Sequence, residues 1–292
     1  MEPVPSTVTK TYAQRGPLQQ FRFAGATAFR CFRCGASKKA KLITVYRGDW
    51  SRRLCNGCYG RLLSLYEIKA GTAADDERAE QMAVVLLSSV AVDDQRHAER
   101  LLLASETRAR RLSPETLRFL ATSEHVAAQL RSEPELEWSP VVIGFCKAVE
   151  VEVLNLLVRP LAQRAAGEDL SDDKNDKDIG RVAAFCADQT RKPPELGGFA
   201  HFLQTVIHSQ RRREKSVLID AFLKLMSECT GSQWVLDPHG LHEALTTLTT
   251  NFRNKAAHID ELGEVDYRQC RELVLGSGGS LWKLVVSMER HR

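Results

Sequence analysis

The sequence predicts a mainly α protein in which a small cysteine-rich module precedes a helical spacer and an all-α helical bundle. Three observations lead to this prediction. Apolar residues recur at helical spacing over most of the chain after residue 74, whereas strand-like alternation is confined to Leu42–Tyr46. Four of the eight cysteines form two tight pairs near the N-terminus. The 292 residues exceed one ordinary core, so we expect several compact units.

Composition narrows the class of protein. No run of about 18 apolar residues is present, and Met1 is followed by Glu2 and two prolines rather than by a basic and then apolar leader. We therefore expect a cytoplasmic protein with no membrane partner. The formal charge of +4 is too mild to indicate a polyanionic partner by itself. A Walker loop, a dinucleotide-binding glycine fingerprint and a serine elbow are all missing from the sequence.

The N-terminal region divides into two parts. Residues 1–20 contain three prolines and scattered polar residues without sustained periodicity, and we expect them to form a flexible arm. Residues 21–70 form the cysteine-rich module. Its cysteines are separated by two residues, then twenty, then two, and they are Cys31, Cys34, Cys55 and Cys58.

This spacing is typical of a structural zinc site. Two thiolates three positions apart reach two corners of a tetrahedron, and a second pair completes a closed four-sulfur site. A closed site leaves no position for a catalytic water, so one Zn²⁺ per chain is expected to serve the fold alone. The remaining cysteines stand singly in apolar surroundings, and we interpret them as small buried hydrophobic residues: Cys146, Cys186, Cys229 and Cys270.

The residues around the cysteines predict the local fold. Gly35 follows the first pair as a zinc knuckle requires, Leu42–Tyr46 and Trp50–Arg53 supply a hairpin, and the second pair opens a helix. A knuckle, a hairpin and a ligand-bearing helix together describe a treble clef. The Leu54–Cys58 run resembles the second half of a GATA-type finger, a likeness that covers only the N-terminal module.

The module is also basic. Between residues 21 and 65 the only acid is Asp49, against ten Lys and Arg residues. Phosphate contacts from such side chains give affinity without sequence choice, and the candidate nucleic-acid contacts are Lys38, Arg52 and Arg53. A solvated surface is the alternative. Basic treble clefs contact RNA, DNA or protein, and the sequence leaves this choice open.

Residues 71–137 are expected to form the helical spacer. Helices are predicted over Ala74–Val92 and Asp93–Leu112. A third helix begins with the Ser-Pro-Glu sequence at residue 113, because serine caps free backbone amides and proline fits the first turn. Two prolines in the Ser132–Pro140 stretch predict a domain boundary there.

Residues 138–292 are expected to form the all-α bundle. Its first helix, Val141–Leu161, has an apolar face, and Pro160 is expected to help terminate it. The Asp- and Lys-rich segment Glu168–Asp178 is predicted to be a solvated loop or a mobile insertion. Further helices are predicted over Ile179–Gln189, Gly198–Ser209, Glu214–Cys229, Gly240–His258, Val265–Leu275 and Leu281–Met288.

One short motif in the bundle carries chemistry. It consists of Arg253, Asn254 and His258 in the sequence Arg-Asn-Lys-Ala-Ala-His. This motif resembles the signature of the HEPN superfamily, and the predicted helices from residue 138 to 292 resemble the frame of that domain. The resemblance implies an all-α ribonuclease domain in which the three residues are catalytic.

The chemistry can also be argued from the side chains. RNA carries its own nucleophile, the 2′-hydroxyl group, so an enzyme needs a proton shuttle and a positive group for the transition state. An imidazole exchanges protons near neutral pH, which suits His258. The guanidinium of Arg253 matches two phosphate oxygens, and Asn254 can hold the 2′-hydroxyl or orient the imidazole. No metal is required, and the product would be a 2′,3′-cyclic phosphate.

The spacing within the motif constrains its geometry. Positions five apart on an ideal helix point about 140° away from each other, so Arg253 and His258 cannot converge from one straight helix. Either the helix ends or bends near Ala256, or two copies of the chain combine their motifs. The resemblance implies the second route and hence a twofold homodimer. The alternative is a structural role, with Arg253 paired on the bundle surface and His258 at a helix end.

These observations predict a metal-independent endoribonuclease that acts on RNA, tRNA included, as a homodimer. Its resemblance to bacterial toxins and phage-defence effectors implies an antitoxin or another regulatory protein as a further partner. A basic run between two helices is a candidate guide for RNA, or a solvated surface: Arg211, Arg212 and Arg213. The alternative function is a non-catalytic nucleic-acid-binding or adaptor protein that reads through the zinc finger and dimerises through its helical domain.

Overall fold

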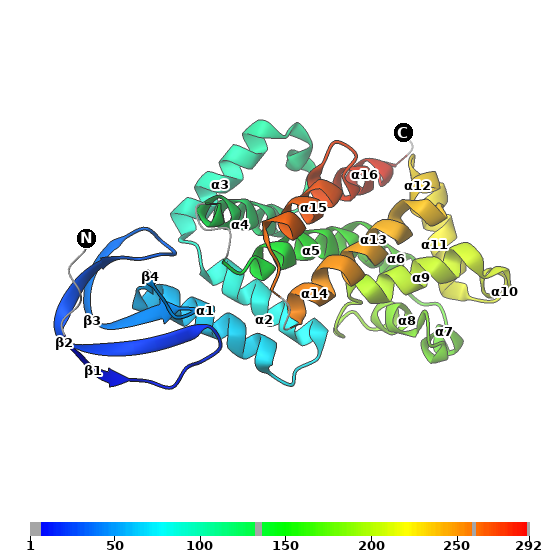
Figure 1. Cartoon of the computed structure of the whole chain (residues 1–292). Helices are drawn as coiled ribbons and strands as arrows, with labels where there is room; N and C mark the ends of the chain where they lie inside the picture. Colours follow the sequence, from blue (N-terminus) through cyan, green and yellow to red (C-terminus); the bar gives the residue numbers. More distant parts are fainter. Residues whose placement is uncertain (1–6, 132–135, 259–260, 291–292) are drawn as a thin grey trace.

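A computed structural model describes residues 7–131, 136–258 and 261–290. An antiparallel sheet occupies one end of the molecule, and helices form the rest (Figure 1). The prediction of a mainly α fold with a small N-terminal module is confirmed. Within the described ranges, no helix combines the length and the hydropathy needed to cross a bilayer.

The sheet is a four-stranded antiparallel meander. Its strands lie in chain order: β1 (Val8–Thr11), β2 (Leu18–Arg30), β3 (Ser37–Tyr46) and β4 (Asp49–Leu54). Strands β2 and β3 form a long hairpin that runs from the Leu18–Tyr46 pair to the Arg30–Ser37 pair. Helix α1 (Asn56–Ala70) follows β4, and its Leu62 and Leu65 are buried in the core that the sheet shares.

The flexible arm predicted over residues 1–20 is wrong where the structure describes it. Residues 8–11 form β1 and pair with β2, which itself begins at Leu18. A register shift between Arg22 and Thr27 interrupts the alternation along β2, so the period-two pattern that identifies a strand is broken. Residues 1–6 of the predicted arm lie outside the described residues.

Helices cover the remainder of the chain. The predicted spacer contains α2 (Asp75–Ser88), α3 (Val92–Ser105), the 3₁₀ turn η1 (Thr107–Arg111) and α4 (Pro114–Leu130). Ser113 caps α4 as predicted, because its hydroxyl accepts a hydrogen bond of 3.2 Å from the amide of Thr116. The predicted bundle contains α5 (Ser139–Val153), η2 (Leu154–Val158), α6 (Arg159–Arg164), α7 (Ser171–Asn175), α8 (Gly180–Ala187), α9 (Leu196–His208), α10 (Gln210–Arg213), α11 (Val217–Ser227), α12 (Ser232–Leu236), η3 (Pro238–His242), α13 (Glu243–Thr247), η4 (Leu248–Arg253), α14 (Asn254–Ala257), α15 (Glu264–Leu275) and α16 (Ser280–Ser287).

The spacer of residues 71–137 and the bundle of residues 138–292 form one packed body. Both α2 and α4 pack against α5, which is buried along most of its length. At their crossing, a Cβ atom on Gly144 would lie 2.0 Å from Ser123 Oγ and 2.5 Å from Leu86 Cδ2. Only glycine permits this approach of three helices. Helices from both sides of the predicted domain boundary therefore share one packed core. Residues 132–135 of the predicted boundary lie outside the described residues.

The sequence predicted that Pro160 helps to terminate the first bundle helix, and this prediction is wrong. The helix continues from α5 through η2, a π-helical turn, into α6, which contains Pro160. Proline lacks an amide hydrogen and its ring conflicts with a carbonyl one turn earlier. The wider π turn directly before it accommodates both defects, so the chain stays helical.

The predicted loop Glu168–Asp178 is ordered and partly buried. It contains α7, whose Asp173 is buried and accepts a hydrogen bond of 2.9 Å from the amide of Leu218. That amide belongs to the first turn of α11, where helix amides lack partners within the helix. The charge-rich composition of this segment gave no indication that Asp173 accepts a hydrogen bond from the first turn of α11.

A buried ion pair joins the sheet end to the bundle. The Nζ atom of Lys69, at the end of α1, lies 2.9 Å from Glu137 and 3.0 Å from the hydroxyl of Ser139. The side chains of Lys69 and Glu137 are 3% and 1% exposed. Glu137 also accepts hydrogen bonds from the amides of Ser139 and Leu262, at 3.0 and 3.4 Å. This carboxylate therefore connects α1, the start of α5 and the chain after the motif.

We predict that Lys69→Met lowers the free energy of unfolding by about 3–5 kcal/mol, because it leaves the Glu137 carboxylate buried without its cation. Urea denaturation followed by circular dichroism measures this. The double variant Lys69→Met/Glu137→Gln removes the stranded charge and is expected to recover part of the loss. A single variant as stable as the wild type would contradict this account of the interface.

Candidate functional site

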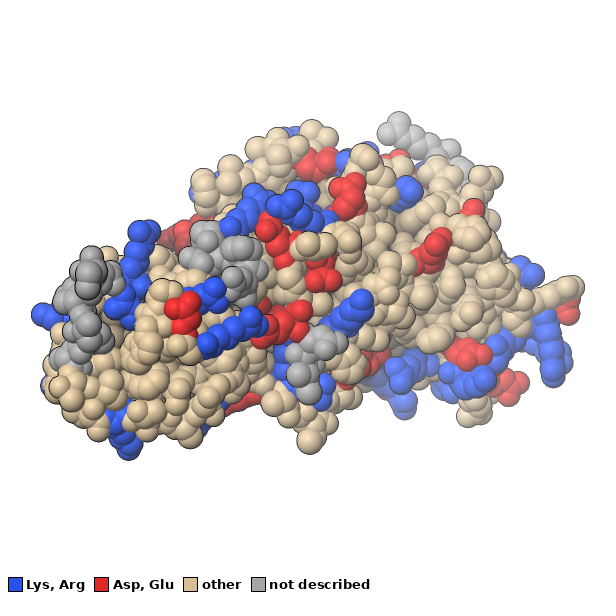
Figure 2. All heavy atoms as spheres, viewed as in Figure 1, with Lys and Arg blue, Asp and Glu red and all other residues tan. Residues whose placement is uncertain are grey.

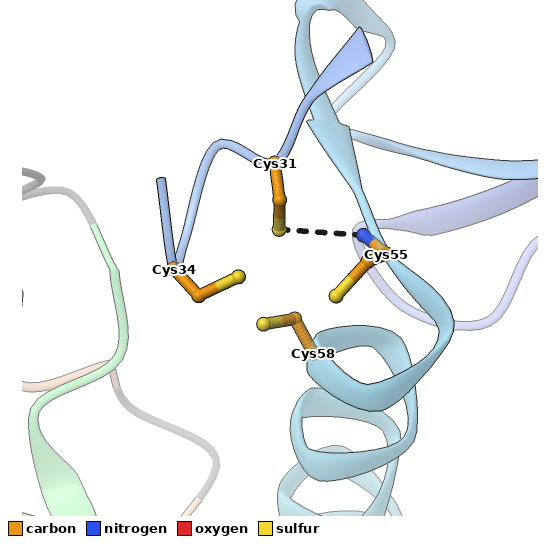
Figure 3. Close-up of side chains that lie close together, drawn as sticks. All are labelled: Cys31, Cys34, Cys55 and Cys58. Carbon is orange, nitrogen blue, oxygen red and sulfur yellow. Dashed lines mark hydrogen bonds between the residues drawn. The ribbon is translucent and has the colours of Figure 1, made fainter. Parts of the chain in front are cut away.

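The cysteine cluster meets the geometric requirements of a metal site. Figure 3 shows the four cysteine side chains directed toward one centre, and their Sγ atoms all lie within 4.8 Å of one another. A tetrahedral zinc site with Zn–S bonds of about 2.3 Å has sulfurs about 3.8 Å apart. The cluster can therefore hold one metal ion, and its all-thiolate donors suit zinc. It consists of Cys31, Cys34, Cys55 and Cys58.

Local backbone structure places these cysteines. Cys31 follows β2, and Gly35 adopts a φ of +66° while its amide donates to the Cys31 carbonyl at 2.9 Å, which closes the knuckle. Cys55 directly precedes α1, and Cys58 lies in its first turn. The Cys55 amide donates to Cys31 Sγ at 3.3 Å (Figure 3), and the Cys58 side chain lowers the pKa of Cys31 to about 4 by hydrogen bonding. Both contacts favour a thiolate.

The predicted nucleic-acid contacts of the module differ in their surroundings. Lys38 is exposed on β3. Arg52 lies 3.3 Å from Asp49 and over the ring of Phe32, 5.5 Å from its centroid. Arg53 is half-buried on β4. On the face in Figure 2, basic groups are spread over the sheet end with few acidic ones, whereas both kinds are interspersed over the helical part.

The motif lies at the end of a helix, which resolves the problem of its spacing. Arg253 closes η4, a π-helical turn, and α14 then runs only from Asn254 to Ala257. His258 has extended backbone angles, φ −81° and ψ 179°. The helix therefore ends before the histidine, as one of the two predicted routes requires.

Arg253 is a buried cation. Its side chain is 2% exposed, forms an ion pair with Asp76 through Nη1, and has Nε 3.9 Å from Glu150. Burial works against its charge, but the carboxylates of Glu150 and Asp76 raise its pKa above the ordinary value. The same Glu150 also pairs with Lys147, which in turn pairs with Glu80 of α2.

His258 contacts Asp75, the residue of α2 that directly precedes Asp76. Its Nε2 atom lies 3.3 Å from Asp75, and its side chain is 52% exposed. The two motif residues therefore meet consecutive aspartates in the first turn of α2. Sequence reasoning missed Asp75 and Asp76, which lie 177 and more residues from the motif. Acidic residues are common in a first helical turn, so their presence gave no indication of this contact.

A cavity of about 530 Å³, which we call the motif cavity, opens beside Asp75 and Asp76; the histidine in its lining is His201, and His258 lies outside the lining. Arg253 and Asn254 contribute to its wall together with basic and acidic side chains. Each acidic residue has a basic neighbour: Asp75 pairs with Arg78 and His258, Asp76 with Arg253, Asp178 with Arg212, and Glu195 with Arg181 and Lys192. This pairing offsets the repulsion that bare carboxylates would exert on a phosphate.

The basic run of α10 does not line the motif cavity. Arg212 is held by Asp176 and Asp178, each at 2.8 Å. Arg211 and Arg213 are exposed. Arg212 therefore contacts Asp178, which lines the motif cavity, but does not line the cavity itself. Among the described residues, Arg211 and Arg213 have no contact with the motif.

Comparison of the chain with protein-family models, with curated proteins and with solved structures finds no match. The site contains the three side chains of the motif. These are a histidine that is half exposed, an arginine fixed in a cavity wall, and an asparagine beside it.

We predict that Cys58→Ser reduces the bound zinc well below one ion per chain and makes the sheet end sensitive to protease, because three ligands leave the site open. Zinc is measured by mass spectrometry after gel filtration. Cys186→Ala removes a buried cysteine outside the cluster and is expected to keep full zinc content. Equal zinc in both variants would argue against the site.

We predict that Asp76→Asn lowers the free energy of unfolding by about 2 kcal/mol, because the buried guanidinium of Arg253 then keeps only the more distant Glu150 as a negative partner. Thermal or urea denaturation measures the change. The matched control is Asp93→Asn, an exposed acid at the start of α3, which is expected to change stability by less than about 0.5 kcal/mol. Similar effects from both substitutions would contradict the role given to Asp76.

Proposed function

We propose that this chain is a metal-independent endoribonuclease, with Arg253, Asn254 and His258 as the active site of a HEPN-type domain. The observation that carries the proposal is the environment of Arg253. Its guanidinium is fixed in the wall of the motif cavity, yet Nε and Nη2 have no hydrogen-bond acceptor among the described residues. Both atoms are buried, so a phosphate oxygen in the cavity would provide an acceptor once the side chain turns toward it.

The reaction needs only groups that the motif and the RNA supply. The 2′-oxygen attacks the adjacent phosphorus, the bond from phosphorus to the 5′-oxygen breaks, and the products carry a 2′,3′-cyclic phosphate and a 5′-hydroxyl. His258 takes the proton of the 2′-hydroxyl or gives one to the leaving 5′-oxygen. Asp75 at 3.3 Å holds the ring in orientation. Arg253 stabilises the charge on the phosphoryl oxygens, and Asn254 holds the 2′-hydroxyl.

The rest of the chain fits this proposal as support for the active site. The N-terminal module is proposed to be a treble-clef zinc finger with one structural Zn²⁺. A homodimer would bring two motifs to one RNA cleft. An active ribonuclease harms the cell that makes it unless it is restrained. We therefore infer a cytoplasmic toxin or phage-defence effector that is controlled by an antitoxin or another regulatory protein and acts on RNA such as tRNA.

One observation favours a second function. Arg253 is almost fully buried and paired with a carboxylate, an arrangement that a purely structural arginine also adopts. In that case the protein is a non-catalytic nucleic-acid-binding or adaptor protein, with the finger as reader and the helical domain as dimeriser. The two functions differ in whether His258, which is half exposed, is needed for activity.

For the ribonuclease, we predict that His258→Ala lowers cleavage of total RNA and of a tRNA pool by about 10²- to 10⁴-fold, because the proton shuttle is lost. Cleavage is measured in EDTA, with retained zinc and fold verified, and the products are tested for 2′,3′-cyclic phosphate ends. Lys255→Ala, an exposed residue of the same turn, is the matched control and should cleave as the wild type does.

Arg253 needs a milder substitution, since Arg253→Ala would leave Asp76 and Glu150 facing a cavity. Arg253→Lys keeps the charge but loses the fork of donors, and it is expected to cleave poorly while remaining folded. Equal cutting by wild type and His258→Ala, or no cutting by wild type, would instead support the nucleic-acid-binding function.

A further inference from the structure

A second cavity, of about 780 Å³, lies between the sheet end and the helical part. We call it the basic cleft. One wall is the knuckle region with Arg30, Phe32 and Arg33, together with Arg61 of α1. The other wall is the turn between α2 and α3, with Asp94 at the start of α3 and His125 on α4. The motif cavity shares none of these residues.

The charges of the basic cleft contrast with those of the motif cavity. Three arginines line the cleft; Asp94 is the one carboxylate in its lining, and Cys31 and Cys34 of the cysteine cluster lie beside the arginines. Over the described ranges, no carboxylate lies within ion-pair distance of Arg30, Arg33 or Arg61; Arg30 donates only to the carbonyl of Gly35, at 3.0 Å. Arg33 contacts the thiol group of Cys58, so Arg30 and Arg61 are the guanidinium groups that have no negative partner among the described residues, and an anion in the cleft would supply one.

An aromatic ring accompanies the arginines. Phe32 lines the cleft and is half-buried, with Arg52 over its ring and Tyr46 stacked on it at 6.1 Å, so the ring presents its remaining exposed part to the cleft. Proteins that bind single-stranded nucleic acid combine a basic groove along the backbone with aromatic side chains on which bases stack. The basic cleft brings arginine side chains and an aromatic ring together in one cavity, as such a site requires.

Helix α2 joins the basic cleft to the motif. Asp75 and Asp76 in its first turn contact His258 and Arg253, and Ser89, directly after its last residue, lines the cleft. Its 14 residues span about 21 Å at 1.5 Å per residue. A strand bound in the cleft would therefore lie several nucleotides from the motif.

We propose that the basic cleft binds single-stranded RNA, with Arg30 and Arg61 on the phosphates and Phe32 in contact with a base, at a distance from the motif set by α2. The RNA identity rests on the proposed function; the cleft itself does not. Arg33 has a different role, because it lies next to the cysteine ligands and offsets the charge of their thiolates.

Binding is tested with the full chain carrying His258→Ala, so that RNA stays intact. Fluorescence anisotropy with labelled oligouridine of about 12 nucleotides gives the Kd at several salt concentrations. Arg61→Ala and Arg30→Ala are each expected to weaken binding about tenfold and to reduce the salt slope by about 0.7, with zinc retained. Phe32→Ala should weaken binding without changing the slope. Arg110→Ala, an exposed arginine outside the cleft, is the matched control and should bind normally.

Unchanged affinity in both arginine variants would overturn the proposal, as would a loss of affinity that occurs only when zinc is also lost. Equal affinity for deoxyuridine strands would overturn the assignment to RNA. The outcome is separable from the ribonuclease proposal. If RNA binding depends on the cleft residues but the wild-type chain never cleaves RNA, the binding proposal stands and the ribonuclease proposal fails. If the wild-type chain cleaves RNA but binding does not depend on the cleft residues, the ribonuclease proposal stands and the binding proposal fails.

Discussion

The buried charge of Arg253 is the constraint on which the arrangement of the helical part depends. A guanidinium with 2% exposure requires negative partners, and they come from two other helices, Asp76 of α2 and Glu150 of α5. Lys147 extends the network from Glu150 back to Glu80 of α2. The motif is therefore held by a helix that the sequence suggested was a spacer. This explains why α2 packs against both α5 and α14.

Two cavities that differ in charge lie at the two ends of that helix, one balanced and one basic. At its start, the carboxylates of the motif cavity all have basic partners. At its end, the arginines of the basic cleft have no carboxylate partners in the described part of the chain. A single helix fixes the separation of the two, because the i to i−4 hydrogen bonds make it a rigid element. In the two proposals, RNA binding is therefore assigned to the basic cleft and RNA cleavage to the motif.

The sequence predicted much of the fold where periodicity was strong, and it failed where tertiary contacts override local signals. Ser113 was identified as a cap because its hydroxyl acts on its own neighbours. The first strands escaped notice because a bulge breaks the alternation of β2. The composition around Asp173 predicts a solvated loop, because composition cannot show that the distant amide of Leu218 lies within hydrogen-bonding distance. Pro160 predicts a helix end, but a π turn accommodates the proline and the helix continues.

For the candidate sites the division is similar. The spacing of Cys31, Cys34, Cys55 and Cys58 alone predicted a cluster that can hold a metal ion, because cysteines three positions apart come together through local backbone geometry. The Arg253 to His258 motif was also visible, but its surroundings were not. Asp75 and Asp76 approach it only because the chain folds back over more than 170 residues, and the basic cleft exists only where two separate units meet. The sequence by itself determined the residues that can do chemistry, whereas the tertiary structure decided their charges, burial and partners, since these depend on groups far apart along the chain.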